Sequence, residues 1–164
     1  MGTMTRSGTD VVSFLKEQHQ DVKRLFDNVL STHGVDRKRA FSKLRMMLEV
    51  HEKAEEEIVH PVARRAISGG EAIIDARVRE EEDAKAILMN LERMDINSTR
   101  FIEQLERFRA AVLKHAEAEE TQEFAALARR LDQSQLSKMT KDVERAEATA
   151  PSSSVAAAQT TSTR

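Results

Sequence analysis

Two stretches of the 164-residue sequence are the most informative about its fold, because each places histidine and glutamate within an otherwise helical apolar pattern. The first is HEKAEEEIVHP at residues 51–61, and the second is HAEAEETQEF at residues 115–124. In both stretches the first residue is a histidine and the fifth is a glutamate. Residues four apart lie on the same face of an α-helix. Each stretch therefore predicts a helix that presents a His–Glu pair on one face.

The two stretches belong to an internal repeat. They align with each other at an offset of 64 residues. Upstream of them, QHQDVK at residues 18–23 aligns with EEEDAK at residues 80–85 at an offset of 62. The repeat predicts a bundle with a pseudo-twofold axis, in which the first half of the domain resembles the second.

Turn signals divide the chain into long segments with apolar residues at helical spacing. These segments cover about residues 10–31, 36–66, 71–94 and 98–131. Short connections between long helices favour antiparallel neighbours, so we predict an all-α, up-down-up-down antiparallel four-helix bundle. Pro61 is expected to kink or end the second helix. A fifth, short helix is expected at about residues 135–147.

The expected domain organisation follows from these segments and from composition. It comprises a flexible N-terminus at residues 1–9, a four-helix domain at 10–131, a short C-terminal helix within 132–148 and a disordered tail at 149–164. The tail is rich in Ser, Ala and Thr, which bury too little apolar surface to fold. The fifth helix either covers the open end of the bundle or pairs with a second subunit.

Composition excludes several classes of function. The chain has no cysteine, so thiol nucleophiles, disulfides and thiolate metal sites are absent. It has 26 basic against 28 acidic residues and no Tyr or Trp, which argues against nucleic-acid partners. No apolar run is long enough to span a membrane, and no secretory signal is visible, so a cytoplasmic location is expected.

Ionisable residues lie among the apolar residues of all four predicted helices. Burying a carboxylate is costly unless it is paired or bound to a metal. Three imidazoles and three carboxylates that point inward from four helices form a cage of six ligands. The predicted ligands are His19, His51, Glu55, Glu81, His115 and Glu119. Nitrogen and oxygen ligands without sulfur suit iron, manganese or zinc.

These motifs resemble those of the hemerythrin-like, HHE cation-binding family. The resemblance covers about residues 10–130 and rests on the segments 18–23, 51–61, 80–85 and 115–124. It implies a four-helix bundle around two non-haem iron ions (Fe2+/Fe3+, oxo- or hydroxo-bridged), with iron favoured over manganese or zinc. By motif position it implies the same six ligands, with Glu55 and Glu119 as the bridging carboxylates.

The sequence departs from the family pattern on the third helix. Family members usually carry one or two histidines there, whereas this chain has three glutamates at residues 80–82. We assign the ligand to Glu81 rather than Glu82, because Glu81 has apolar neighbours at helical spacing and aligns with His19 in the repeat. A carboxylate-rich pocket stabilises ferric iron, which favours peroxide chemistry, sensing or iron holding over reversible oxygen carriage.

His60 adds a further histidine to the second helix. A regular α-helix places it half a turn from His51, and the repeat pairs it with Phe124. We therefore expect a hydrogen-bonded core residue, with a place beside the ligands as the alternative. His33 lies in a predicted turn and is expected to be solvated.

Three functions fit the predicted site. The first is removal of peroxide by catalase-like disproportionation, and the second is a non-catalytic module that senses or holds O2, NO or iron. The third is a metal-free helical interaction protein, which the inward His and Glu residues argue against. The expected partners are small ligands (O2, H2O2 or NO), with neither nucleic acid nor membrane, in a monomer or homodimer.

Overall fold

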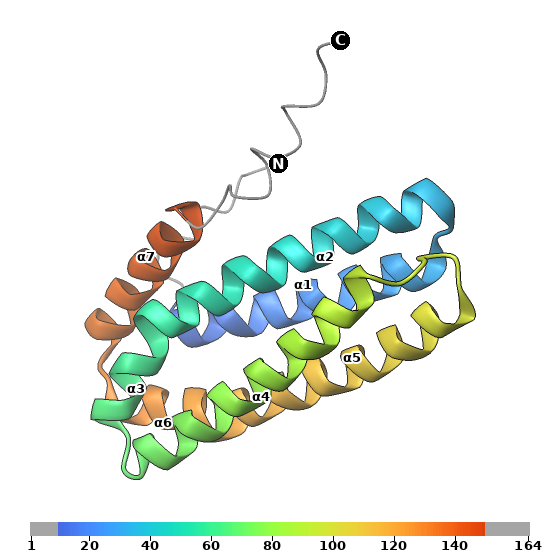
Figure 1. The fold of residues 1–164 in the computed structure, drawn as a ribbon. Helices are drawn as coiled ribbons and strands as arrows, with labels where there is room; N and C mark the ends of the chain where they lie inside the picture. The colour runs from blue at the N-terminus through green and yellow to red at the C-terminus, as the bar shows by residue number, and fades with distance from the viewer. Residues whose placement is uncertain (1–9, 150–164) are drawn as a thin grey trace, which may run out of the picture.

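The computed structural model describes residues 10–149, and this part of the chain is helical without strands. Four long helical rods run antiparallel to one another, and a further helix lies at one end of the bundle (Figure 1). The predicted all-α, up-down-up-down four-helix bundle is therefore confirmed.

The rods follow the chain in order. The first is α1, Val11–Ser31, and the third is α4, Gly70–Glu92. The second and fourth rods are each divided by a π-helical turn. The second consists of α2 (Gly34–Ala54), η1 (Glu55–Val59) and α3 (His60–Ala66). The fourth consists of α5 (Thr99–Ala118), η2 (Glu119–Phe124) and α6 (Ala125–Arg130).

Local sequence explains where several rods begin. Asp10 caps α1 by accepting a hydrogen bond from the backbone N–H of Ser13 at 2.9 Å, and Ser98 caps α5 in the same way. Gly69 precedes α4 with φ +71°, a conformation that favours glycine. A Cβ on Gly70 would lie 2.5 Å from the carbonyl oxygen of Ala63, so the turn between α3 and α4 also requires glycine there.

The second rod continues past Pro61 to Ala66. Pro61 was expected to kink or end this helix; it does not end it, and the helix is irregular at the π turn just before Pro61. The fourth rod has an equivalent π turn without a proline, so proline is not needed for this geometry. A π turn inserts one residue into the helical ladder and rotates the later residues of the rod about its axis.

The fifth helix is α7, Gln133–Thr149, and it packs against α1, α2 and η1. It buries an apolar stripe at helical spacing: Leu136, Met139, Val143 and Ala146. The predicted fifth helix is thus present and covers the end of the bundle. The predicted tail begins at Thr149, which is the last residue of α7, and its remaining residues lie outside the described part, as does the expected flexible segment 1–9.

Buried apolar side chains form two separate cores along the bundle. One lies near α7 and includes Leu15, Ile74 and Leu127, and the other lies toward the opposite end and includes Val22 and Phe108. His19 lies between Leu15 and Val22 on α1, so the two cores leave a polar layer between them. This layer contains the candidate site.

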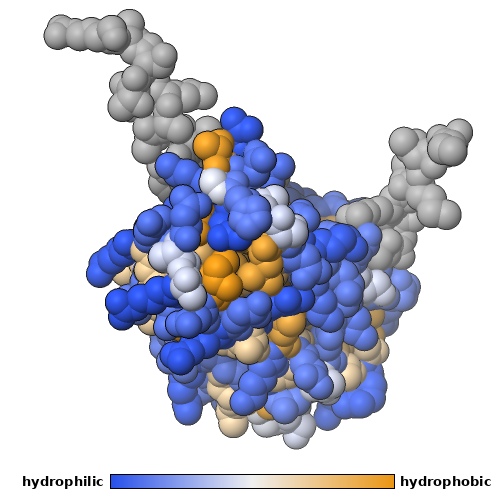
Figure 2. Space-filling view, turned by 90° about the vertical axis from the view of Figure 1, so that its right-hand side faces the viewer, coloured by the Kyte–Doolittle hydropathy of each residue, from blue (hydrophilic) through white to orange (hydrophobic). Residues whose placement is uncertain are grey.

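Hydrophilic side chains dominate the surface at the end that carries the α1–α2 and α4–α5 connections, around a small group of hydrophobic ones (Figure 2). None of the helices in the described part of the chain is long and apolar enough to cross a membrane.

Candidate metal centre

The polar layer between the two cores receives side chains from all four rods. Five of the six predicted ligands are buried, and His115 is 14% exposed. Glu55 and Glu119, the two carboxylates that follow the histidines by four residues, are almost completely inaccessible to solvent. The sequence prediction that these residues point inward therefore agrees with the structure.

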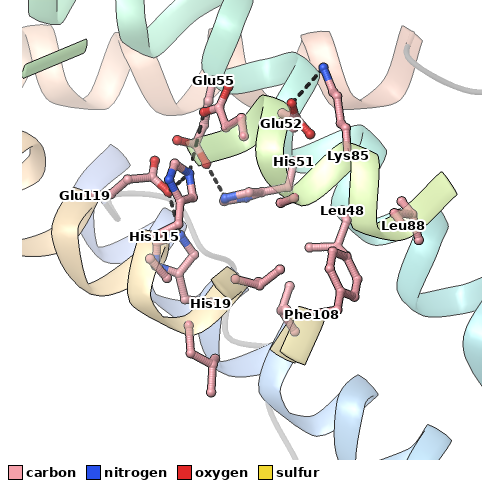
Figure 3. Close-up of a pocket in the computed structure, with 16 residues that line it drawn as sticks. His19, Leu48, His51, Glu52, Glu55, Lys85, Leu88, Phe108, His115 and Glu119 are labelled. Carbon is pink, nitrogen blue, oxygen red and sulfur yellow. Dashed lines mark ion pairs between the residues drawn. The ribbon is translucent and has the colours of Figure 1, made fainter. Parts of the chain in front are cut away.

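The two His–Glu pairs have the geometry that their spacing predicts. On the second rod, His51 Nε2 is in direct contact with Glu55 Oε1. On the fourth rod, His115 Nε2 lies 2.9 Å from Glu119 Oε1. Figure 3 shows both pairs facing the same cavity. Each pair therefore presents one imidazole nitrogen and one carboxylate at the same depth in the bundle.

The single residues of α1 and α4 reach the same place from the other two rods. His19 Nε2 lies 3.7 Å from Glu119 Oε1. Glu81 Oε1 lies 3.5 Å from His115 Nε2. The structure thus brings together all six residues that the sequence singled out. Glu81 is the buried member of its glutamate run, whereas Glu82 is exposed.

The outer nitrogens of these three histidines are also paired. In each ring Nε2 faces the cluster, and Nδ1 faces an oxygen acceptor outside it. The acceptors are Gln18 for His51 (2.8 Å), Glu80 for His115 (3.0 Å) and Glu120 for His19 (3.4 Å). An outer acceptor of this kind fixes the tautomer and orientation of a metal-binding imidazole and leaves Nε2 free to coordinate.

The π turns bring two more residues onto the inner face. His60 is 3% exposed, with Nε2 2.8 Å from Glu81 Oε1 and Nδ1 2.9 Å from Glu123 Oε1. Phe124, its partner in the repeat, stacks on the His19 ring with centroids 5.7 Å apart. The half-turn separation expected for His60 was wrong, because it assumed a regular α-helix through the π turn.

Glu123 is a completely buried carboxylate that the sequence prediction missed. A signal for it exists, since Glu123 follows Glu119 by four residues, the spacing that singles out Glu119 after His115. Its partner is His60, which was itself placed off the inner face. A sequence argument can place Glu123 in the cluster only if it also places His60 there, because the two side chains are hydrogen-bonded to each other.

Several buried atoms of the cluster lack a hydrogen-bond partner within the described residues. They are His19 Nε2 and one oxygen each of Glu55, Glu81 and Glu123, together with both oxygens of Glu119. Leaving such groups unsatisfied costs about 1–3 kcal/mol each, and more when they are charged. Metal coordination would satisfy them, so the residues present fit a metal cation.

Within the described residues, three groups have the spacing of metal ligands. Glu52, Glu56 and Glu81 form one that is partly exposed, and the other two are buried and overlap. The first buried group contains His19, His51, Glu55 and Glu119, and the second contains Glu55, His60 and Glu81. Within each group, one ligand atom per residue lies within 4.8 Å of the others. Glu55 belongs to both buried groups, which is the position that a bridging carboxylate would occupy.

Burial and mutual charge shift the pKa values in the first buried group. Burial and the nearby charge of His51 lower the pKa of His19 to about 4. Burial alone would raise the pKa of Glu55, but the charge of His51 and its hydrogen bond outweigh burial and lower it to about 2. The Glu55 carboxylate is therefore ionised at neutral pH.

Two further histidines of the cluster have raised pKa values. Burial would lower the pKa of His60, but hydrogen bonds to Glu123 and Glu81 outweigh it and raise the pKa to about 10. Burial lowers the pKa of His115, but the hydrogen bond to Glu81, the charge of Glu55 and the hydrogen bond to Glu80 together outweigh burial, so this pKa is also raised. Without a metal, the protonated His60 imidazole faces the Glu81 and Glu123 carboxylates, and a bound cation would replace its proton.

A cavity of about 60 Å³ adjoins the cluster (Figure 3). Its wall away from the cluster is apolar and includes Val22, Leu48, Leu88, Phe108 and Val112. Lys85, which also lines the cavity, is half exposed and pairs with Glu52 at 2.8 Å and with Glu56 at 3.4 Å. A water-sized molecule needs roughly 10–15 Å³ on this measure, so the cavity holds only very small molecules.

The relationship to known proteins agrees with this geometry. The family model described as the hemerythrin HHE cation-binding domain matches residues 10–127. The chain belongs to the hemerythrin HHE cation-binding family. This confirms the resemblance inferred from the motifs, and the buried His/Glu cluster of this HHE domain is compatible with metal binding.

A solved structure of similar fold is that of a hemerythrin HHE cation-binding domain-containing protein, the Rv2633c homologue from Mycobacterium kansasii. It superposes with a TM-score of 0.74 at 20% sequence identity, over 85% of this chain and 88% of that one. At this identity the likeness concerns the fold of the HHE domain. No curated protein matches the chain in sequence.

Proposed function

We propose that this HHE protein holds two iron ions and acts on small dioxygen species, with catalase-like disproportionation of hydrogen peroxide as its reaction. The observation that carries the proposal is the overlap of two ligand groups at Glu55. One shared carboxylate between two sets of buried ligands is the arrangement expected for a pair of cations rather than for one.

The donor set supports iron. The cluster offers imidazole nitrogens and carboxylate oxygens, and the chain has no sulfur ligand from cysteine. Glutamate stands on α4 at the position where family members usually carry histidine, and a further carboxylate, Glu123, lies beside it. Additional negative charge stabilises the ferric state, which favours peroxide chemistry over reversible oxygen carriage.

Bound in this cluster, two iron ions would supply the electrons for alternate reduction and oxidation of peroxide. The protein side chains would do the rest. Outer acceptors such as Gln18 and Glu80 hold the imidazoles in place through Nδ1. The apolar wall that includes Leu48 and Phe108 limits the cavity to small, uncharged molecules such as H2O2, O2 or NO.

Peroxide turnover tests the reaction. Iron-loaded protein should consume many equivalents of H2O2 and release one O2 for every two H2O2 lost, and this activity should vanish in His51→Ala. A single stoichiometric spectral change with O2, NO or peroxide, without turnover, would contradict the catalytic reading. That outcome would instead assign the site to sensing or iron holding.

A further inference from the structure

His60 is bound between two carboxylates at the edge of the cluster. Its Nε2 lies 2.8 Å from Glu81 Oε1, and its Nδ1 lies 2.9 Å from Glu123 Oε1. All three side chains are at most 4% exposed. Both nitrogens of this imidazole are therefore held in place by buried groups.

The contacts of His60 repeat the pattern of the three histidines predicted as ligands. In each of the four rings, Nε2 faces a carboxylate of the cluster and Nδ1 faces an outer oxygen acceptor. His33, outside the cluster, differs, because it is exposed and its Nδ1 faces the guanidinium of Arg37. The pattern therefore separates the histidines of the cluster from the one at the surface.

The internal repeat shows why an extra histidine is needed. His19 on α1 aligns with Glu81 on α4, and His60 aligns with Phe124. On the α1 side of the cluster the single-rod residue is the imidazole of His19, and Phe124 of the fourth rod stacks against it. On the α4 side the carboxylate of Glu81 takes the place of that imidazole, and His60 of the second rod contacts it. The exchange leaves two imidazoles on each side of the cluster.

We propose that His60 is a fourth histidine ligand, which binds through Nε2 the metal ion on the Glu81 side of the cluster. Glu123 is its positioning residue, because it accepts the Nδ1–H hydrogen bond and fixes the ring. The π turn of η1 is the structural element that makes this possible, since it rotates His60 onto the face of Glu55. The inference rests on the proposed two-iron function.

A titration of the metal-free protein with Fe2+ under anaerobic conditions tests the assignment. His60→Phe introduces the residue that the repeat carries at the equivalent position, so its volume is compatible with this layer. We expect the wild type to bind two Fe2+ per chain and His60→Phe to bind the second at least tenfold more weakly. His33→Phe is the matched control and should bind both as the wild type does.

The results of this titration distinguish a failure of the His60 assignment from a failure of the two-iron function. Two ions bound by His60→Phe with wild-type affinity would overturn the role of His60 and leave the two-iron function standing. A wild type that binds fewer than two ions would overturn both. The helical circular dichroism of the metal-free variants verifies that any loss is not due to unfolding.

A measurement on the wild-type protein tests whether His60 is a metal ligand even if His60→Phe does not fold. With Co2+ as the probe, each coordinated imidazole should give one exchangeable, strongly shifted Nδ1–H proton resonance. We expect four such resonances, and three would overturn the proposal. Glu123→Gln should shift one of the four and leave the others in place, which a purely structural role for Glu123 would not produce.

Discussion

The two halves of the bundle have the same arrangement of helices and differ in the side chains that these helices carry. In each half, a rod with a single inward residue lies beside a rod with a His–Glu pair and a π turn. Even the outer acceptors correspond, because Gln18 and Glu80 are equivalent in the repeat and hold His51 and His115. The framework therefore directs the side chains inward, whichever residues it carries.

The differences between the halves concern charge and the fifth helix. Gln18 is neutral, and its Nε2 donates a hydrogen bond of 2.7 Å to Glu147 on α7. Glu80 has a carboxyl group in place of the amide and is paired with Arg77 at 2.5 Å. In the first half the acceptor of a cluster histidine thus connects to α7, whereas in the second half it connects to a neighbouring cation. The same helical framework therefore holds its outer acceptors in two different surroundings, a contact with α7 in one half and an ion pair in the other.

The largest effect is expected from removing the paired histidine of either half. His51→Ala and His115→Ala should each abolish metal loading, because each removes an imidazole that faces Glu55 or Glu119. The thermal midpoint measured with metal present should fall, since a bound metal stabilises only the folded state. His33→Ala should change neither quantity. Full metal retention in both variants would break the ligand assignment and the equivalence of the halves.

A double substitution tests whether the halves are interchangeable. Combining Glu81→His with His60→Phe gives the α4 side of the cluster a His and Phe pair like the one that His19 and Phe124 form on the α1 side. We expect this variant to regain the second metal ion lost in His60→Phe alone, as measured by elemental analysis. If the double variant contains as little metal as His60→Phe alone, a histidine at position 81 does not compensate for the loss of His60.

The outer acceptors should have a smaller effect. Gln18→Leu and Glu80→Leu should each weaken metal affinity by about 10–100-fold, the usual consequence of losing such a partner. Only Gln18→Leu should also accelerate amide hydrogen exchange in α7, because only Gln18 bonds to Glu147. Equal exchange in α7 for the two variants would contradict the difference drawn between the halves.

The smallest effect is a dependence of metal affinity on pH. The pKa of His60 is raised to about 10, so this imidazole is protonated in the metal-free protein at neutral pH. The pKa of His51 is also raised, because the charge and hydrogen bond of Glu55 outweigh burial. Metals bind the neutral imidazole, so uptake releases protons and affinity should rise with pH. His19, with its pKa lowered to about 4, should contribute no proton. Titrations at pH 6, 7 and 8 that give one affinity would contradict this.

The sequence predicted the framework well, because its signals are local and periodic. The spacing of His51 and Glu55, and its echo at His115 and Glu119, suffices to place four side chains on inner faces. His19 was identified from its place within an apolar stripe, and Glu81 from its apolar neighbours and its alignment with His19 in the repeat.

The positions of His60 and Glu123 were not predicted, for a physical reason. A π turn changes the hydrogen-bond ladder by one residue, and the two turns share little sequence, EEEIV at 55–59 and EETQEF at 119–124. Their geometry depends on packing between rods rather than on local propensity. Every residue after such a turn is rotated relative to a regular helix, so a constant helical period places it on the wrong face.

The proposed two-iron site is best tested by the metal content of the purified wild-type protein, expressed with ample iron. We expect about two iron ions per chain in a folded helical protein, and almost none in His51→Ala purified in the same way. A folded wild type that contains no metal, or a single zinc ion, would contradict this proposal.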